Sequence, residues 1–585
     1  MFTIVGQRVF QLLILAACAL VSASAQTPQT PVILISVDTL RADHLSGYGY
    51  RKLSTPHFDA LAAGGTLYGQ VQTQIPLTLP SHTCLFTSTY PFENGVEENA
   101  ERVPAGVVTL ASTLRAQGYK TAAFIGSSLL DRRFGLNVGF DFYDSPFEAG
   151  SDMLQNPYSL RVRRDGALVF RSATQWLNAH RGEKTFVFIH LFDLHTPYSR
   201  PATNGLSGYD TQIAYVDQLL GHFEQYLAAN GWWDRSLVVL FADHGESLGD
   251  HGEASHGYFI YQSTLWVPLL IHWPKGDNVP ARMDQAAGLI DVAPTILDLL
   301  HIPEPPSFEG QSLLKPGNHF VYAESVYARD AFQWAPLRGL RQGQMVYIDA
   351  PKPELYDLGT DPHELTNLIM KNPGEAATMK RRLDTLRKRY AADRPAPARD
   401  TSPQTLQQMR SLGYISGGRQ EQAGNAPDPK DRLPEYRQFE KGLEALYAGH
   451  LSQAIATFQS LLASDRHNLP ARGNLGDALL KAHREGEALR QWQIALHDDP
   501  SFSPADDAIG EYWLARGDYA KAKPSFEHIV QNSPGDYQAQ YELGLVDRRL
   551  GLDREASAHL AAACRLLPDS AACAADEVHR ISQPQ

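Results

Sequence analysis

The stretch 32-VILISVD-38 is an almost wholly apolar run that ends in a carboxylate. A short run of this kind is typical of a strand buried on both faces of a sheet. Helix-period stretches lie between such runs, as in 210–229, where the apolar residues fall on one face. Strands that alternate with helices predict an α/β fold, a mostly parallel sheet sandwiched by helices. Four further runs continue the pattern: 121-TAAFIG-126, 186-FVFIHLF-192, 237-LVVLFA-242 and 267-VPLLIHW-273.

Three acidic residues follow predicted strands at their carboxyl ends: Asp38, Asp193 and Asp243. Ligands of open α/β sheets bind beyond that edge of the sheet. A buried carboxylate is costly without a partner, so three that converge predict a bound cation. For any one of them alone, a helix cap or a turn is the alternative explanation.

The segment 243-DHGESLGDHGEASHG-257 places imidazoles beside carboxylates directly after a predicted strand. Carboxylate and imidazole ligands suit Zn²⁺ or Mn²⁺ better than Ca²⁺, which prefers oxygen ligands throughout. The segment is therefore a candidate metal site, from which we leave out His251 as a solvated loop residue.

A hydroxyl stands at the start of a further predicted helix, in 76-PLTLPSHTCLFTS-88. A helix N-terminus attracts anions, because its free N–H groups and its dipole are positive there. Thr78 at this place is either an N-cap or a nucleophile. A nucleophilic hydroxyl needs activation near neutral pH, and a bound metal ion supplies it.

Seven stretches together carry a family resemblance: 33-ILISVDTLRADHLSGYGY-50, 55-TPHFDALAAGGT-66, 76-PLTLPSHTCLFTSTYPFENGV-96, 190-HLFDLHTPY-198, 242-ADHGESLGDHGEASHGYFIYQ-262, 354-ELYDLGTDPHELTNL-368 and 409-MRSLGYISG-417. Across about residues 30–416 the chain resembles the sulfatase family within the alkaline phosphatase superfamily. The resemblance implies an alkaline-phosphatase-like fold. It also implies that Asp38, Asp243 and His244 bind metal. Thr78 then takes the place of the nucleophile and faces the metal.

The chain departs from the sulfatase pattern at the nucleophile. Sulfatases carry the motif Cys/Ser-x-Pro-Ser-Arg at this place, and its Cys or Ser is oxidised to formylglycine. This chain reads 78-TLPSH-82 there instead. Threonine cannot become that aldehyde. His82 stands where the family's Arg steadies the nucleophile, and we expect it to contact the substrate. Threonine at this place is instead similar to nucleotide phosphodiesterases and phosphoethanolamine transferases.

The phosphoethanolamine transferases also resemble this chain in Asp-His-Gly-Glu-Ser-Leu-Gly followed by His-Gly. This similarity implies that His256 binds a second metal or contacts the transferred group. By the same analogy His195 contacts the ester or protonates the leaving oxygen, and Asp193 binds substrate on the same side.

The expected function is metal-dependent hydrolysis of an anionic ester by Thr78. A phosphodiester or phosphomonoester is the first expectation, and a sulfate ester is the other. We expect one or two Zn²⁺ ions, with Mn²⁺ and Ca²⁺ as alternatives. Two other functions stay open: a phosphoethanolamine-type transferase acting on an envelope glycan or lipid, and a non-catalytic glycan-binding scaffold.

The C-terminal part has a period of 34 residues, seen in Gly442, Gly476, Gly510 and Gly544 and again in Phe458, Trp492, Phe526 and Leu560. A small residue on one helix facing a bulky one on the next predicts stacked helical hairpins. The period resembles the tetratricopeptide repeat. It predicts an all-α domain over 435–585, with four repeats and a capping helix, after a linker at 417–434. Such a solenoid offers a concave surface to a protein or peptide; a spacer or platform is the alternative.

Residues 1–25 are typical of an export signal, with an apolar run from Val9 to Val21 and a small-x-small site at 23-ASA-25. The stretch 15-LAAC-18 also resembles a bacterial lipoprotein signal, which makes a lipid tether at Cys18 the alternative. We therefore expect a periplasmic or secreted protein.

The charge and the cysteine content of the chain exclude some classes of partner and of fold. The 585 residues carry 52 Lys and Arg against 65 Asp and Glu, a net charge of −13. Nucleic-acid binding requires a basic surface, so we expect no such partner. With four cysteines the chain is not a disulfide-dense scaffold. In an oxidising compartment Cys564 and Cys573 either pair or stay as two buried thiols.

Overall fold

The computed structural model describes residues 30–99, 101–147, 163–203, 205–275, 280–315, 317, 320–390, 426–566 and 573. The predicted export signal, the Cys18 tether, the first half of the predicted linker and nearly all of the predicted capping helix lie outside these ranges. No helix within them is long and apolar enough to cross a bilayer.

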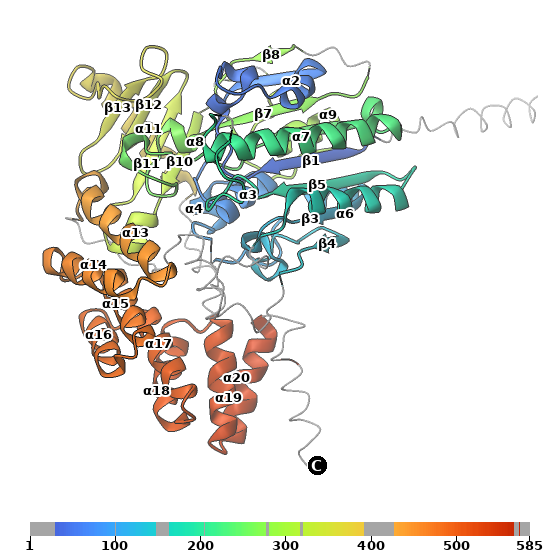
Figure 1. The fold of residues 1–585 in the computed structure, drawn as a ribbon. Helices are drawn as coiled ribbons and strands as arrows, with labels where there is room; N and C mark the ends of the chain where they lie inside the picture. Colours follow the sequence, from blue (N-terminus) through green and yellow to red (C-terminus); the bar gives the residue numbers. More distant parts are fainter. Residues whose placement is uncertain are drawn as a thin grey trace, which may run out of the picture.

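One large sheet forms the centre of the N-terminal domain (Figure 1). Its strands are β1 (Val32–Val37), β2 (Gly65–Gln72), β3 (Lys120–Phe124), β4 (Phe142–Asp144), β5 (Thr185–Leu191), β6 (Leu237–Phe241), β7 (Trp266–His272), β8 (Arg282–Met283) and β9 (Ala287–Gly288). Their order is β4-β3-β5-β1-β6-β7-β2-β8, with β9 paired to β2. The first five strands of this order run parallel, and β7 runs antiparallel to both β6 and β2. All five predicted strands are present.

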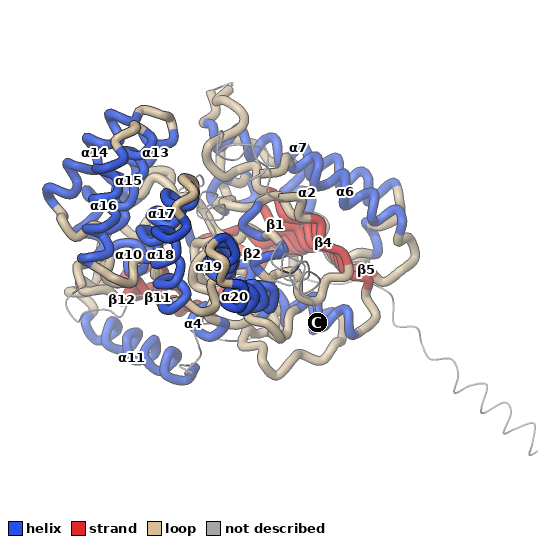
Figure 2. The backbone as a smooth tube through the Cα atoms, turned by 90° about the horizontal axis from the view of Figure 1, so that it is seen from below, coloured by secondary structure: helices blue, strands red, loops and turns tan. Residues whose placement is uncertain are grey.

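Helices cover both faces of this sheet (Figures 1 and 2). On one face α2 (Pro56–Ala63), α6 (Gly166–Ala179) and α7 (Gly208–Ala229) pack together, and on the other α3 (Thr78–Thr87) packs with α5 (Leu110–Ala116) and α9 (Val292–Leu299). The apolar face predicted for α7 is buried, since these residues are at most 2% exposed: Ile213, Val216, Leu220, Phe223 and Leu227. The predicted α/β sandwich is confirmed.

A second, antiparallel sheet follows, which the sequence analysis did not predict. Its order is β10-β11-β12-β13. The strands are β10 (Phe320–Ser325), β11 (Leu337–Gln342), β12 (Met345–Asp349) and β13 (Glu354–Asp357). The helix α10 (Tyr327–Phe332) lies between the first two, and α11 (Pro373–Tyr390) packs on the sheet.

Four helical hairpins make up the C-terminal part, as the 34-residue period predicts. A Cβ on Gly442 would overlap the ring of Phe458. One on Gly510 would overlap the ring of Phe526, so the period marks where paired helices approach most closely. The helices are α13 (Leu433–Tyr447), α14 (Leu451–Ser464), α15 (Leu469–Lys481), α16 (Glu485–Asp498), α17 (Ser503–Leu514), α18 (Tyr519–Asn532), α19 (Tyr537–Arg549) and α20 (Asp553–Leu566).

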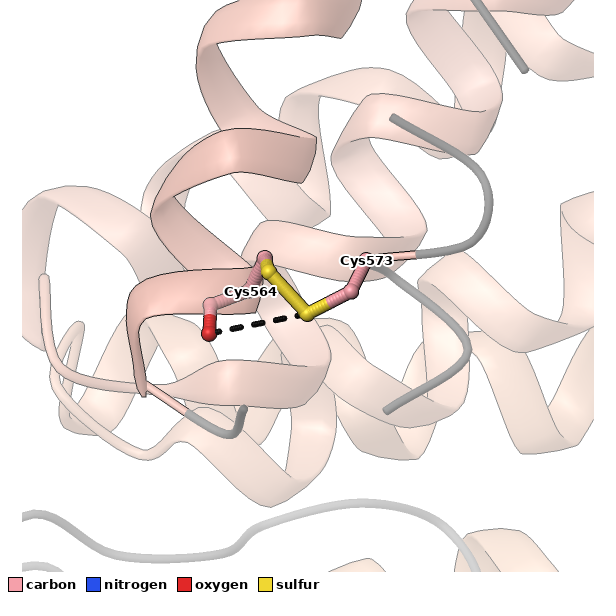
Figure 3. Close-up of a disulfide and its surroundings, with 2 residues drawn as sticks. All are labelled: Cys564 and Cys573. Carbon is pink, nitrogen blue, oxygen red and sulfur yellow. Dashed lines mark hydrogen bonds between the residues drawn. A yellow bond between two sulfur atoms is a disulfide. The ribbon is translucent and has the colours of Figure 1, made fainter. Parts of the chain in front are cut away.

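The repeat array meets the N-terminal domain near both of its ends (Figure 1). Near the start of the array, Arg437 in α13 donates through Nε to the carbonyl oxygen of Gly252 over 2.7 Å. At its far end, Arg102 Nη1 donates to the carbonyl oxygen of Leu566 over 2.6 Å. Of the two states left open for the C-terminal cysteines, the structure has the disulfide, which Figure 3 shows between Cys564 and Cys573.

Candidate active site

Asp38 and Asp243 meet at the carboxyl edge of the large sheet, because β1 and β6, the strands that precede them, pair in parallel. Both side chains are fully buried. Asp38 Oδ1 and Asp243 Oδ2 have no hydrogen-bond partner among the described residues. Burial raises the pKa of both carboxyls, and the negative charge of Asp38 raises the pKa of Asp243 further. Two such carboxylates are stable as anions only beside a positive charge.

His244 brings a nitrogen to the same place. Its Nδ1 lies 3.0 Å from the carbonyl oxygen of Gly245 and donates to it, so its Nε2 carries the lone pair. Burial lowers the pKa of His244 to about 4, which keeps the ring neutral. The ligand atoms of Asp38, Asp243 and His244 all lie within 4.8 Å of one another. Two unpaired carboxylate oxygens and one imidazole lone pair fit a divalent cation.

Thr78 is the first residue of α3, and its hydroxyl points into this cluster. Its Oγ1 donates to Asp38 Oδ2 over 3.2 Å and lies 3.4 Å from His244 Nε2. Leu77 occupies the N-cap position of the helix, so the alternative explanation of Thr78 as a helix cap does not apply. The helix start is fixed in place by Ser81, whose hydroxyl donates to the carbonyl oxygen of Asp243 over 2.7 Å.

His82 lies one helical turn after Thr78 and beneath it. Its Nδ1 donates to the carbonyl oxygen of Thr78 over 2.7 Å, and its Nε2 is 2.9 Å from Ser36 Oγ. The ring is fully buried. Both nitrogens are therefore used inside the protein, and none is left for the substrate contact that the sequence analysis expected. His82 supports the start of α3 from below.

Asp193 does not join the metal cluster, contrary to the prediction that three carboxylates converge. Its oxygens accept hydrogen bonds from the backbone N–H of Gly166, at 3.1 and 3.3 Å, at the start of α6. Arg200 Nη1 lies 3.8 Å away on its other side. Asp193 therefore binds the start of a helix, which is the alternative explanation given above for such an acid.

His195 and His256 lie beside His244. The ring centroid of His256 is 4.3 Å from that of His244 and 5.2 Å from that of His195. His256 Nδ1 is 3.2 Å from Glu246 Oε1. Burial lowers the pKa of all three imidazoles. The structure thus brings both predicted histidines to the site, although within the described residues the close-set ligand groups do not include His256.

Two residues of this region were missed by the sequence analysis. His190 in β5 is fully buried, and its Nε2 lies 3.5 Å from Asp38 Oδ2. A histidine in the middle of an apolar strand was the signal for it. Arg163 donates to the carbonyl oxygens of His195 at 2.9 Å and Pro197 at 2.7 Å, and so holds the loop that carries His195. Nothing in the sequence around Arg163 marks it.

Comparison with known proteins identifies three family models along the chain. Residues 30–302 match the family model described as Sulfatase, and residues 249–389 match the model described as N-sulphoglucosamine sulphohydrolase, C-terminal. Residues 439–501 and 508–571 match a tetratricopeptide repeat model.

Curated relatives are similar at low identity. The chain is 27% identical over 223 residues to arylsulfatase K of Bos taurus, which covers 34% of this chain and 41% of that protein. It is 24% identical over 413 residues to an ulvan-active sulfatase of Formosa agariphila, covering 60% of this chain and 79% of the relative. The span matched is thus less than half of the first relative and most of the second.

Solved structures agree in fold. A phosphonate monoester hydrolase of Agrobacterium radiobacter superposes with a TM-score of 0.52 at 20% identity, covering 62% of this chain and 96% of that structure. At this identity the likeness shows the fold of the N-terminal domain. Residues 30–302 therefore form a sulfatase-family domain, and the chain continues into tetratricopeptide repeats.

Proposed function

We propose that this protein hydrolyses a phosphodiester or phosphomonoester with unmodified Thr78 as the nucleophile. The observation that carries the proposal is the place of Thr78 Oγ1, 3.2 Å from Asp38 Oδ2 at the N-terminus of α3. Threonine cannot be oxidised to formylglycine, which favours phosphoryl transfer to an ordinary hydroxyl. A sulfate ester stays the alternative substrate.

Asp38, Asp243 and His244 are the residues that would hold a divalent cation, and their donor set suits Zn²⁺. Such an ion lowers the pKa of a nearby hydroxyl and offsets negative charge on the ester oxygens. Thr78 Oγ1 gives its proton to Asp38 Oδ2 and attacks phosphorus in line with the leaving oxygen. The bond from phosphorus to that oxygen breaks, and phosphothreonine forms. The N-terminus of α3 is the positive end of the helix dipole, which attracts the anion. Water then attacks the phosphothreonine and restores Thr78.

We propose that His195 and His256 contact the ester on the leaving-group side. Nδ1 of His195 lies 2.6 Å from the carbonyl oxygen of Thr196 and donates to it, so Nε2 is the ring nitrogen that carries the lone pair. Burial and the neighbouring His256 hold the pKa of His195 well below its usual value. An anionic ester beside the ring favours the charged form and so supports its action as an acid.

The expected export and the partner of the array are further parts of the proposal. A disulfide between Cys564 and Cys573 suits an oxidising compartment, which supports a periplasmic or secreted protein. Tetratricopeptide arrays offer concave surfaces to proteins, which supports a protein or peptide partner on the later repeats.

Thr78→Ala, assayed on an aryl phosphodiester, an aryl phosphomonoester and an aryl sulfate, tests the nucleophile. We expect turnover of the preferred ester to fall by at least ~10²-fold. Thr83→Ala is the matched control, since its buried hydroxyl lies in the same helix and donates to the carbonyl oxygen of Leu79, 2.8 Å away. A phosphothreonine located at Thr78 by mass spectrometry would support the assignment. Full turnover by Thr78→Ala on all three esters would refute it.

A further inference from the structure

The contact between the repeat array and the catalytic domain falls on the loop that carries His256. Two residues after His256, the ring of Tyr258 stacks on the ring of Tyr436 in α13, with centroids 4.2 Å apart and planes within 9° of parallel. The hydroxyl of Tyr258 donates to the carbonyl oxygen of Pro429 over 2.6 Å. The side chain of Tyr258 is thus held by residues that belong to the array and to the turn before it.

The same loop is held again on the other side of His256. Four residues before it, the carbonyl oxygen of Gly252 accepts the 2.7 Å hydrogen bond from Arg437 Nε. Gly252 has a φ of +86°, and a Cβ there would overlap the Arg437 guanidinium. The carboxylate of Glu253 closes the loop from inside, accepting from the backbone N–H of Tyr258 at 2.8 Å. Helix α13 therefore contacts both ends of the seven-residue loop 252–258.

The interface around these contacts is apolar and buried. The ring of Phe332, at the end of α10, lies edge-on to Phe439 of α13, with centroids 5.4 Å apart. Five aromatic side chains from the two parts form one cluster in which none is more than 8% exposed: Tyr258, Phe332, Trp334, Tyr436 and Phe439. An interface of this composition resembles a divided core rather than a surface contact.

The first repeat departs from the period of the array where it touches the catalytic domain. At the repeat position of Arg437, the later repeats have a buried alanine: Ala471, Ala505 and Ala539. At the position of Tyr436 they have Pro470, Pro504 and Gln538. A solenoid needs a cap at each end, because its first repeat has no preceding repeat to cover it. Here the catalytic domain covers the first repeat.

We propose that the first repeat is part of the catalytic unit, and that Tyr436 and Arg437 are positioning residues that hold His256 beside His244. The catalytic half of this inference rests on the proposed function. Neither residue touches the reacting atoms, and both act through the backbone of residues 252–258. The array is then more than an attached docking module.

The test compares Tyr436→Ala and Arg437→Ala in the full-length protein with Gln538→Ala, the same repeat position as Tyr436 in the fourth repeat. Amide hydrogen exchange of residues 248–259 is followed by mass spectrometry, and kcat and KM are measured on a small aryl phosphate ester. We expect both alanine variants to exchange at least tenfold faster in this loop and to lose at least tenfold in kcat, with KM nearly unchanged. Tyr436→Phe keeps the stacked ring and should behave as the unchanged protein, as should Gln538→Ala.

Unchanged exchange in both alanine variants, or an equal acceleration in Gln538→Ala, would overturn the inference. Arg437 is exposed, so Arg437→Ala keeps the test decisive if Tyr436→Ala does not fold. If the unchanged protein hydrolyses the ester no faster than Thr78→Ala does, the proposed function fails. The exchange measurement then still decides whether α13 holds the loop.

Discussion

Asp38 and Asp243 show how much of this site depends on a positive charge that the side chains around them do not provide. Each lies fully buried, and each has one oxygen without a hydrogen-bond partner within the described ranges. Their raised pKa values mean that folding without a cation favours protonated acids over carboxylates. The pair therefore destabilises the metal-free fold and provides ligands in the metal-bound fold.

Asp243→Asn is expected to raise the thermal stability of the metal-free protein and to abolish the stabilisation by added Zn²⁺. The amide of asparagine is neutral at every pH, so the metal-free variant no longer has to protonate a buried acid to fold, but the change also removes a ligand. Each kcal/mol gained should raise Tm by only about 1 °C, because the entropy of unfolding grows with chain length. Thermal unfolding with chelator and then with Zn²⁺ measures both effects. Asp234→Asn is the control, since that carboxylate is 71% exposed. A zinc-dependent rise of equal size in Asp243→Asn would contradict the assignment.

Glu364 provides a prediction on pH. Its carboxyl is buried, its Oε2 accepts from the backbone N–H of Gln262 over 2.7 Å, and burial raises its pKa to about 8. The folded state thus keeps a proton that the unfolded state releases above about 4.5. Stability from the neutral acid is complete below that pH and is lost as pH rises towards 8. We expect Glu364→Gln to weaken the fall in unfolding free energy between pH 5 and 8.

Denaturant titrations at the two pH values measure this difference. Glu375→Gln, at an exposed position early in α11, serves as the control and should leave the slope unchanged. If the fall in stability of Glu364→Gln equals that of the unchanged protein, Glu364 is ionised in the folded state and the argument is wrong.

The sequence predicted the positions of Asp38 and Asp243 correctly, but it did not predict those of Asp193 and His82. The positions of Asp38 and Asp243 follow from parallel pairing of strands that are visible as apolar runs. Asp193 stands at the end of the same kind of strand, yet its side chain turns to the backbone of Gly166. That choice depends on where α6 begins, which lies outside the local sequence. His82 was expected at the substrate, but the helix geometry directs its ring under Thr78.

At the scale of elements, the glycine period of the repeats is a packing rule. Gly476→Ala should destabilise the array by about 1–3 kcal/mol, because its Cβ would overlap the indole of Trp492, which is 1% exposed and cannot move aside. Gly486→Ala is the control: no atom lies within 4 Å of a Cβ there, and alanine favours the helix by about 0.5–1 kcal/mol. Urea unfolding of the full-length protein separates the two. Equal stability of Gly476→Ala and the unchanged protein would show that the helices can move apart freely.

Uniformly apolar strands and strictly repeated helices were predictable, whereas strands of mixed composition were not. The strands of the large sheet and the 34-residue repeats both show simple periods. The second sheet has strands of four to six residues, and β11 reads LRGLRQ, with arginines among its apolar residues. Burial of Arg341 in that strand, 2% exposed, runs against the ordinary preference of arginine for the surface. The contacts that permit it come from elements far away in the sequence.

At the scale of the whole molecule, catalytic and repeat parts share one hydrophobic cluster, and this determines how the chain tolerates truncation. Removing the whole array would expose Tyr258, Phe332 and Trp334 together, an apolar patch that favours aggregation. Ending the chain after residue 532 leaves the first three repeats and this cluster intact. We expect the shorter deletion to stay soluble and to retain turnover of small esters, and the complete deletion to lose both. Size-exclusion chromatography and an ester assay measure the outcome, and a soluble, active protein without any repeat would contradict it.

Because the array contacts the N-terminal domain near both of its ends, the distance between the two contacts limits the length of the array. Gly252 receives the first repeat and Arg102 receives the end of the fourth, so the span between these two anchors sets how many hairpins fit. Inserting one more 34-residue unit would carry the last helix past Arg102, and deleting one would leave it short. The exposed side chains along the array can therefore vary in evolution, whereas any other number of repeats would lose the contact with Arg102.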